Sequence, residues 1–156
     1  MRDDVPWLTE QEQRAWQGLQ FMQMRLTAAL ARQLAADSDL SYSDYLVLVA
    51  LTDARQGRLR SWELARDLGW EKSRLSHHVT RMVERGLVRK QACATDRRGG
   101  YVVVTAFGRR QIAAAAPGHV RAVRTLFLDH VTDDQLEAVA AASEKVLAAL
   151  DVSVTE

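Results

Sequence analysis

The sequence predicts a mainly α fold of the α+β class: a winged helix-turn-helix framed by long helices at both ends of the chain. Residues 61–88 have the apolar spacing and the glycines of a short helix, a tight turn and a second helix. A basic segment with paired glycines and three consecutive valines follows, which is typical of a β-hairpin. The segments on either side carry apolar residues at helical spacing. We therefore expect one domain at 1–156, with a winged-helix lobe at 41–105 and a helical dimerisation region at 9–36 and 106–151.

The first predicted element is a long helix that runs to about Ala36. Thr9 and Glu12 have the spacing of a capping box at its start. Its apolar residues form two stripes on nearly opposite sides, one with Trp16, Leu19, Met22, Leu26 and Leu30 and one with Phe21, Met24, Ala28 and Ala35. A helix that is apolar on two sides needs two partners, so we expect the body of its own chain on one side and a second copy on the other. The alternative is that these are scattered exposed apolar residues, which are common in soluble proteins.

A second helix is expected from Ser41, whose capping-box partner is Asp44, to about Ala54. The apolar run 45–51 also fits a buried strand, but the cap and the length favour a buried helix. Gln56-Gly57 should then turn the chain, and 58–60 could form a minimal strand beside the wing.

The helix-turn-helix should begin at Ser61 as N-cap, turn at Gly69 and end in a left-handed conformation at Gly86. At roughly 100° per residue, the second helix has an apolar stripe of Leu75, Val79, Met82 and Val83. Ser73, His77, Thr80 and Arg81 point the opposite way, with Arg74, Ser76 and His78 on the flanks. A helix buried on one side and cationic on the other can enter a major groove, where Arg can donate two hydrogen bonds to guanine. A solvated amphipathic helix is the alternative.

The wing should begin with a strand from Leu87 to about Ala94 and turn at 96–100, since Asp caps its own backbone and glycines allow positive φ. Arg97 and Arg98 at its tip fit a minor groove or a phosphate track, and Asp96 could orient Arg98. Arginines at a loop tip can also simply be solvated.

After the wing, Thr105 can cap a helix that Pro117-Gly118 should bend or split. Thr132 and Gln135 form another capping box at the start of a final helix. One face of that helix resembles a coiled-coil surface and is a candidate partner for the N-terminal helix across a two-fold axis; it comprises Leu136, Val139, Ala140, Ser143, Val146, Leu147 and Leu150.

The net charge of +1 conceals an uneven distribution. Residues 53–110 hold fourteen Lys and Arg against six Asp and Glu, a net of +8, and the remainder carries −7. Such segregation is expected when one lobe faces a polyanion. The single cysteine excludes an internal disulfide, and no apolar run approaches a membrane span, so we expect a cytoplasmic protein.

An enzyme finds little support in the sequence, and we expect no cofactor and no metal. His77 and His78 are adjacent on a helix and diverge by about 100°, so they cannot chelate one metal together. His119 and His130 have no Cys or Glu in ligand spacing. Cys93 lacks a nearby His-Asp pattern; oxidation of Cys93, favoured by Arg89 and Lys90, is the open alternative to an inert strand thiol.

From Leu40 to Gly108 the chain resembles the MarR family of transcriptional regulators. The resemblance is carried by Glu63-Leu64-Ala65, the Arg-Met-Val-Glu-Arg-Gly-Leu-Val run at 81–88, the Asp-x-Arg-Gly wing tip and the Thr-x-x-Gly exit at Thr105 and Gly108. It implies a dimeric winged helix that represses genes until a small molecule or an oxidant releases it. Glu71 departs from the family pattern, because an acid near the start of the recognition helix repels phosphate.

The combined prediction is a homodimeric, sequence-specific repressor of double-stranded DNA with a pseudo-palindromic operator. The expected DNA contacts are Lys72, Ser73, Arg74, Ser76, His77, His78, Arg81, Arg97 and Arg98, with Asp96 supporting the wing. The resemblance further implies a small ligand, with an aromatic acid as the family-based guess and Trp16, Tyr45 and His119 as candidate lining residues; ordinary core packing is the alternative for each. A winged helix that binds only protein, or a redox-responsive regulator that uses Cys93, are the alternative functions.

Overall fold

The computed structural model describes the backbone of residues 6–93 and 96–153 and the side chains of residues 6–92 and 100–151. The chain divides into two compact units, one ending at Val120 and the other beginning at Arg121. The first unit contains α1 (Glu10–Asp37), α2 (Tyr42–Asp53), β1 (Arg58–Arg60), α3 (Ser61–Leu68), α4 (Lys72–Glu84), β2 (Val88–Cys93), β3 (Asp96–Val104) and most of α5 (Ala106–Leu126). The second contains the end of α5 and α6 (Asp133–Ser153). The predicted winged helix-turn-helix with long flanking helices is confirmed.

Three helices begin at the predicted caps. Thr9 Oγ1 accepts from the backbone N–H of Glu12, whose carboxylate accepts from Thr9 N at 2.8 Å. The same reciprocal pair joins Ser41 to Asp44 at the start of α2. Thr132 and Gln135 repeat the arrangement at α6. Such boxes are set by residues three apart, which is why the local sequence is sufficient to locate them.

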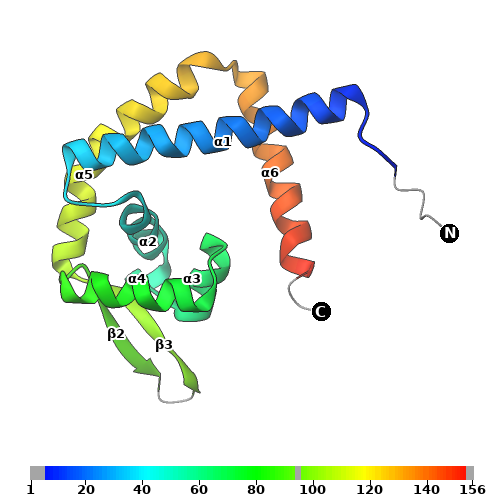
Figure 1. Ribbon diagram of the computed structural model, residues 1–156. Helices are drawn as coiled ribbons and strands as arrows, with labels where there is room; N and C mark the ends of the chain where they lie inside the picture. Colours follow the sequence, from blue (N-terminus) through cyan, green and yellow to red (C-terminus); the bar gives the residue numbers. More distant parts are fainter. Residues whose placement is uncertain (1–5, 94–95, 154–156) are drawn as a thin grey trace. The chain divides into compact units, whose positions relative to one another are not determined.

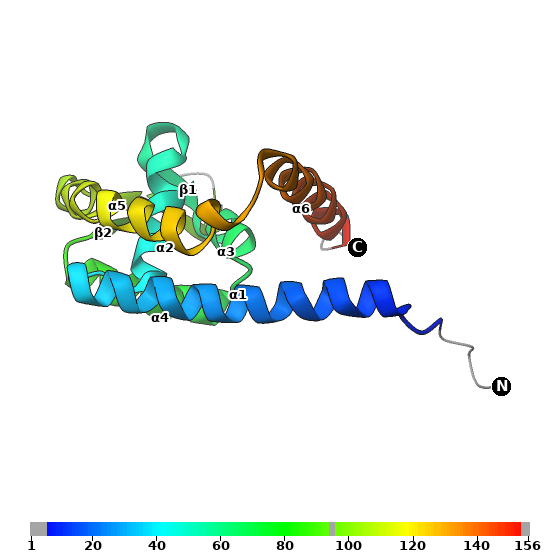
Figure 2. The same ribbon diagram turned by 90° about the horizontal axis from the view of Figure 1, so that it is seen from above.

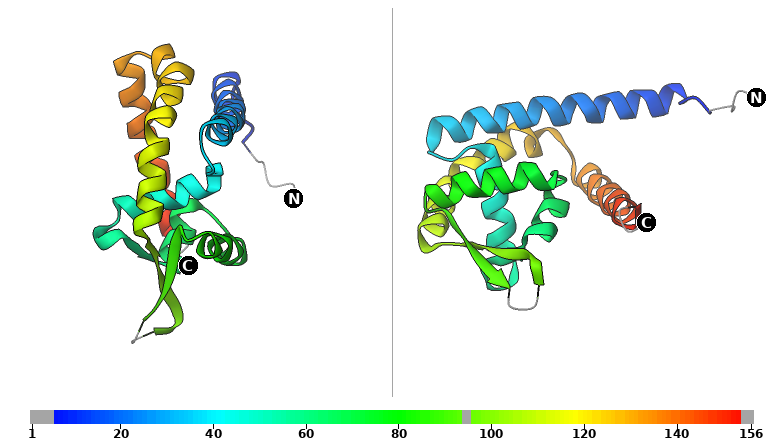
Figure 3. Two further views of the ribbon diagram at one scale, coloured as in Figure 1. Left: turned by 90° about the vertical axis from the view of Figure 1, so that its left-hand side faces the viewer. Right: turned by 60° about the horizontal axis from the view of Figure 1, so that its bottom comes forward.

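Within the first unit, α2 is the central helix. Tyr45, Val47, Leu48 and Leu51 are all buried, so the ambiguous apolar run is a helix surrounded by protein and the prediction of a helix is confirmed. In Figures 1 and 3, α1 lies on one side of α2, and α4 with the β2–β3 hairpin lies on the other. The core around α2 also takes Leu64 from α3, Leu75, Val79 and Met82 from α4, Leu87 and Val88 after it, and Val102 and Val104 from β3.

The described strands form a three-stranded antiparallel sheet in the order β1-β3-β2. The minimal strand at 58–60 is confirmed, since Arg58 pairs with Val103. The predicted turn at 96–100 is wrong: these residues belong to β3, and Cys93 pairs with Asp96, so the chain reverses between them. Gly100 does not form a turn; it allows the backbones of β3 and β2 to approach closely, because a Cβ there would lie 2.7 Å from the carbonyl oxygen of Gln91. Ala94 lies outside the described residues.

The helix-turn-helix has the predicted glycines at its two ends. Gly69 (φ +62°) ends α3 and Gly86 (φ +73°) follows α4, both left-handed. The predicted N-cap at Ser61 is wrong by one residue: Arg60 is the cap, and its N–H donates to Glu63 Oε2 at 2.8 Å. The Ser61 hydroxyl donates instead to the carbonyl of Gly100 at 3.1 Å, which ties α3 to the wing.

The exit from the wing is a compact junction. Thr105 Oγ1 accepts from Gly108 N at 2.9 Å, which confirms the predicted cap of α5, and its hydroxyl lies 2.6 Å from the carbonyl oxygen of Gly86. A Cβ at Gly108 would collide with the carbonyl oxygen of Leu87. Pro117-Gly118 was predicted to bend or split α5: it does not split it, since the chain stays helical through Pro117, and the bend stays a prediction.

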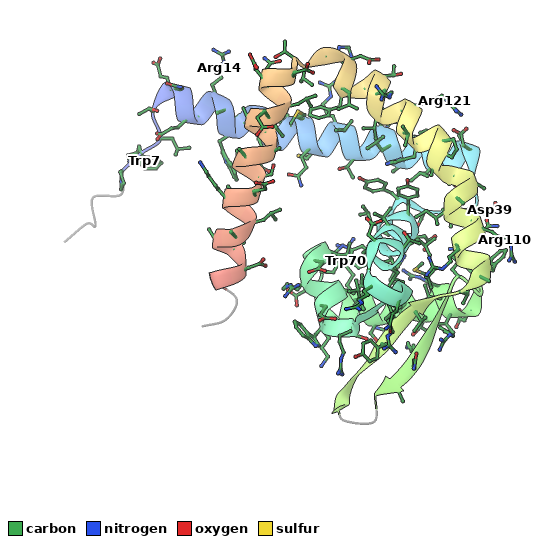
Figure 4. All side chains as sticks on the ribbon, turned by 180° about the vertical axis from the view of Figure 1, so that it is seen from behind. Trp7, Arg14, Asp39, Trp70, Arg110 and Arg121 are labelled. Carbon is green, nitrogen blue, oxygen red and sulfur yellow. The ribbon has the colours of Figure 1, made fainter. Side chains whose placement is uncertain are left out.

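The N-terminal half of α1 extends beyond the rest of the first unit (Figure 2). Of its apolar residues only Leu30 and Leu34 are buried, while Trp16, Phe21 and Met24 are more than half exposed. The side chain of Arg14 projects from this extension (Figure 4).

Candidate nucleic-acid interface

Helix α4 presents a polar, cationic face to solvent. Leu75, Val79 and Met82 anchor its other side in the core. Val83, expected in the same apolar stripe, is exposed. The exposed residues include seven of the expected helix-face side chains: Lys72, Ser73, Arg74, Ser76, His77, Thr80 and Arg81. The first turn has no acidic residue, and Glu71 occupies the N-cap without a side-chain capping bond.

His78 is the exception among the expected DNA-facing residues. Its expected place on an exposed flank is wrong: the residue is only 8% exposed. Nε2 lies 3.0 Å from Oδ1 of Asp44, although off the axis of a full hydrogen bond. The ring also stacks edge-on with Trp70 at 5.3 Å between centroids. A helical wheel puts residue 78 at the border of the buried side, and the carboxylate of α2 draws it inward.

Asp44 organises the polar interior of the lobe. It is 1% exposed, and Oδ2 accepts from Ser41 N at 2.9 Å and from Arg85 Nη1 at 2.7 Å. Burial by itself raises the pKa of this carboxyl, but the close contact with His78 and the hydrogen bonds from Arg85 and Ser41 outweigh it and hold the pKa well below its ordinary value. The buried group is therefore a carboxylate at neutral pH, which anchors the C-terminal end of α4 to the start of α2.

Trp70 was not singled out from the sequence, yet it lies under the cationic face. The guanidinium carbon of Arg74 sits 4.2 Å from its ring centroid, a cation–π distance. Figure 4 shows the indole among the side chains of the helix-turn-helix. The available signal was the spacing 70, 74 and 78: Arg74 and His78 lie one turn apart on α4, and Trp70 precedes the helix by two residues.

The sheet adds further cations, of which Lys90 lies beside α4. Lys90 Nζ of β2 donates to Thr80 Oγ1 at 3.1 Å, joining the wing to α4. Arg58 and Arg60 of β1 both lie over the Tyr101 ring, at 4.6 and 4.5 Å. The side chains of Asp96, Arg97 and Arg98 lie outside the described residues, as does that of Cys93; the backbone of all four belongs to the wing strands.

A cavity of about 370 Å³ lies between α2 and α5. The described residues that line it are Tyr45, Val49, Thr52, Asp53, Arg109, Ile112, Ala113 and Ala116. Of the three candidate ligand residues, the structure brings Tyr45 and His119 together, with ring centroids 4.3 Å apart. Trp16 is 55% exposed on α1. Burial raises the pKa of the Tyr45 hydroxyl and lowers the pKa of His119, so both are neutral at pH 7.

Over the described part of the chain, no three His, Cys, Asp or Glu side chains group as potential metal ligands. In the same residues, no helix has the length and apolar character needed to cross a membrane.

Comparison with known proteins gives a consistent result. The MarR family model matches residues 38–99. The crystal structure of AbsC, a MarR family transcriptional regulator from Streptomyces coelicolor, is 35% identical with a TM-score of 0.84, covering 94% of this chain and 99% of that one. Sco3205, a MarR family transcriptional regulator from the same organism solved in complex with DNA, is also 35% identical with a TM-score of 0.84, covering 93% and 91%.

A more distant structure is that of Bordetella bronchiseptica BpsR, whose DNA binding is regulated by 6-hydroxynicotinic acid. It is 20% identical with a TM-score of 0.73 and covers 90% of this chain and 96% of that one, which is a likeness of fold. No curated protein matches the sequence.

Proposed function

The chain belongs to the MarR family of DNA-binding transcriptional regulators, and from this premise we propose that it is a homodimeric repressor that binds a pseudo-palindromic operator and is released by a small ligand. One observation carries the DNA-binding part: the cationic, solvent-facing side of α4, whose other side is fixed in the core. The net charge of +8 over residues 53–110 supports it.

In this proposal, Arg74, His77 and Arg81 contact bases in the major groove, while Lys72, Ser73 and Ser76 contact phosphates or neighbouring bases. Arg97 and Arg98 hold the flanking minor groove, with Asp96 supporting the wing. His78 is assigned to the interior instead. Two α4 helices in a two-fold assembly would enter successive major grooves roughly 34 Å apart, so the operator should span about 16 to 20 base pairs.

The test is selection of bound duplexes from a random pool, followed by affinity measurements at several salt concentrations. The logarithm of affinity should fall steeply with the logarithm of salt if several phosphates are neutralised per dimer. Arg98→Ala should weaken binding to all duplexes, whereas Arg74→Ala should also relax the preference at one base-pair position. A flat salt dependence would favour a winged helix that binds only protein, and equal losses on all sequences for both variants would contradict the division of roles.

Homodimerisation is supported by the apolar side chains that α1 and α6 leave exposed. They include Trp16, Phe21 and Met24 on α1 and Val139, Val146, Leu147 and Leu150 on α6. We propose 9–36 and 106–151 as the dimerisation region and 41–105 as the DNA-binding lobe of one domain spanning 1–156. Sedimentation at micromolar concentration should give a dimer, and Leu147→Glu or Phe21→Glu should shift it toward monomer. A wild-type protein that stays monomeric would contradict the proposed operator with two half-sites.

The proposed effector is a small aromatic acid that occupies the cavity between α2 and α5. Ile112 and the alanines offer an apolar wall, and Arg109 offers a cation for a carboxylate. A panel of benzoates and hydroxynicotinates should contain compounds that raise the melting temperature and weaken duplex binding, which requires different affinity for two states. Arg109→Ala should remove both effects; effects that survive this change would place the ligand elsewhere.

Repression itself is tested with a reporter gene placed behind the selected operator. Expression should fall when the protein is produced and recover with the effector. A rise in expression would make the protein an activator. Oxidation that releases DNA from the wild type but not from Cys93→Ser would favour the redox alternative.

A further inference from the structure

Three aromatic and cationic side chains are linked by contacts along the first half of α4. Trp70 lies just before α4, and Arg74 and His78 follow at intervals of one turn. The guanidinium of Arg74 lies over the indole at 4.2 Å, and the imidazole of His78 meets it edge-on at 5.3 Å. The indole therefore contacts both the exposed guanidinium of Arg74 and the buried ring of His78.

The same imidazole also supports a second arginine. Nη2 of Arg81 lies 3.2 Å from Nδ1 of His78. A guanidinium can only donate, so Nδ1 is the acceptor and the ring proton is on Nε2. Nε2 faces Oδ1 of Asp44 at 3.0 Å. The chain of contacts thus runs from a carboxylate of α2, through a buried imidazole ring, to an arginine on the exposed face of α4.

Asp44 gives this chain a fixed origin. Its other oxygen accepts from Ser41 N and from Arg85, so the carboxylate is held from both α2 and the end of α4. A carboxylate held in this way keeps a fixed place 3.0 Å from Nε2 of His78, and the Trp70 ring packs edge-on against the same imidazole. The orientation of Arg81 is therefore linked to residues that are not on the DNA-facing surface.

We propose that Trp70 and His78 are positioning residues that orient Arg74 and Arg81 before DNA is bound, so that part of the sequence preference is encoded beneath the contact surface. This inference rests on the proposed function, since it takes the two arginines as the DNA-contacting groups. Fixing a long side chain in advance removes an ordering cost from binding, which corresponds to roughly three- to tenfold in affinity for each arginine. The gain applies only where the arginine meets its preferred base, so it appears as specificity.

The His78 contacts can be separated by two substitutions. The amide of His78→Asn reaches the position of Nδ1 and can accept from Arg81, whereas the amide of His78→Gln reaches the position of Nε2 and can contact Asp44. On the duplex that the wild type selects from a random pool, we expect His78→Asn to bind within about twofold of the wild type. His78→Gln should bind roughly three- to tenfold more weakly and lose preference at the base pair that Arg81→Ala affects.

The Trp70 contact is tested by a separate double-mutant cycle, in which single and double variants are compared. Trp70→Phe keeps a ring beneath Arg74 and should retain most of the preference, whereas Trp70→Leu should relax it at the base pair that Arg74→Ala affects. Each positioning variant combined with its arginine variant should bind no more weakly than the arginine variant alone. Thermal unfolding of every variant identifies those folded at the temperature of the assay, and the two independent cycles allow the proposal to be judged if one variant unfolds.

The outcomes distinguish this inference from the proposed function. A wild-type protein that selects no duplex removes the proposed function itself. If the wild type does select a duplex, two results would overturn the positioning role alone. One is that His78→Asn and His78→Gln are equally impaired. The other is that the losses are fully additive to those of Arg74→Ala and Arg81→Ala. Retained affinity and base-pair preference in His78→Asn and Trp70→Phe support the positioning role. A merely structural role would not change the preference at one particular base pair.

Discussion

The lobe around α2 and the helix α1 use apolar residues in different ways. In the lobe, Leu48, Leu51 and Leu64 are completely buried by residues of the same chain. In α1, Phe21 is 61% exposed and most of the helix surface faces solvent. The lobe is therefore packed by residues of one chain, whereas much of the apolar surface of α1 is left exposed by its own chain. If the proposed dimer forms through α1, stability and assembly depend on separate segments, and mutations in each should have separate effects.

The largest expected difference in stability is between a leucine of the lobe and a leucine of α6. Like α1, α6 has exposed apolar side chains. Leu64→Ala should lower the free energy of unfolding by about 2–5 kcal/mol, because it leaves a cavity in a closed core. Leu147→Ala, at a position that is 61% exposed, should cost little at high dilution and act mainly on the concentration dependence of the melting temperature. Urea unfolding at two protein concentrations measures both. Similar losses for both at high dilution would remove the distinction.

An intermediate effect on stability is expected when a buried carboxylate of the lobe is compared with an exposed one. Asp44→Asn should destabilise the lobe by about 1–3 kcal/mol, since it removes the charge that Arg85 and His78 face in a buried site. Asp67→Asn is the matched control: Asp67 pairs with Arg66 at 2.8 Å on the surface and should contribute less than about 1 kcal/mol. Denaturant titration at pH 7 compares them, and equal effects would contradict the organising role of Asp44.

The Asp44 contribution has a defined pH window. Because the folded pKa is lowered from the ordinary 3.8, the stabilisation is complete above that value and is lost as the pH falls below it toward the folded pKa. The difference between wild type and Asp44→Asn should therefore be constant from pH 7 to about pH 5 and shrink at lower pH. A difference that shrinks already between pH 7 and pH 5 would assign the dependence to another group.

The smallest expected effect concerns His119, which packs on Tyr45. Burial lowers its folded pKa below 6.5, so the unfolded chain takes up a proton first as the pH falls, and the fold loses stability by at most about 1.4 kcal/mol per pH unit. His119→Gln does not titrate. The unfolding free energy of the wild type should therefore fall relative to that of the variant between pH 7.5 and pH 5.5. Parallel profiles would show that His119 is not coupled to folding.

The sequence was a reliable guide where a feature depends on residues a few positions apart. The capping boxes at Thr9, Ser41 and Thr132 and the left-handed Gly69 and Gly86 are of this kind. The candidate DNA-facing residues of α4 were also identified from helical spacing alone, and all except His78 are exposed.

The errors occur where a distant residue decides the outcome. His78 turns inward because of Asp44, thirty-four positions earlier in the chain, and no periodicity reveals that partner. Gly100 was read as a turn glycine, but it is required by the backbone of Gln91 across the sheet. Trp70 was overlooked because its role depends on the conformation of Arg74 in the folded helix.

The junction at Thr105 determines how movement can spread through the molecule. The threonine side chain bridges the end of the recognition helix to the first turn of α5, and Gly108 lets the two backbones touch. We therefore expect the beginning of α5 and the end of α4 to move together. If the proposed ligand displaces α5, the lobe should then rotate as one piece, with its internal packing unchanged.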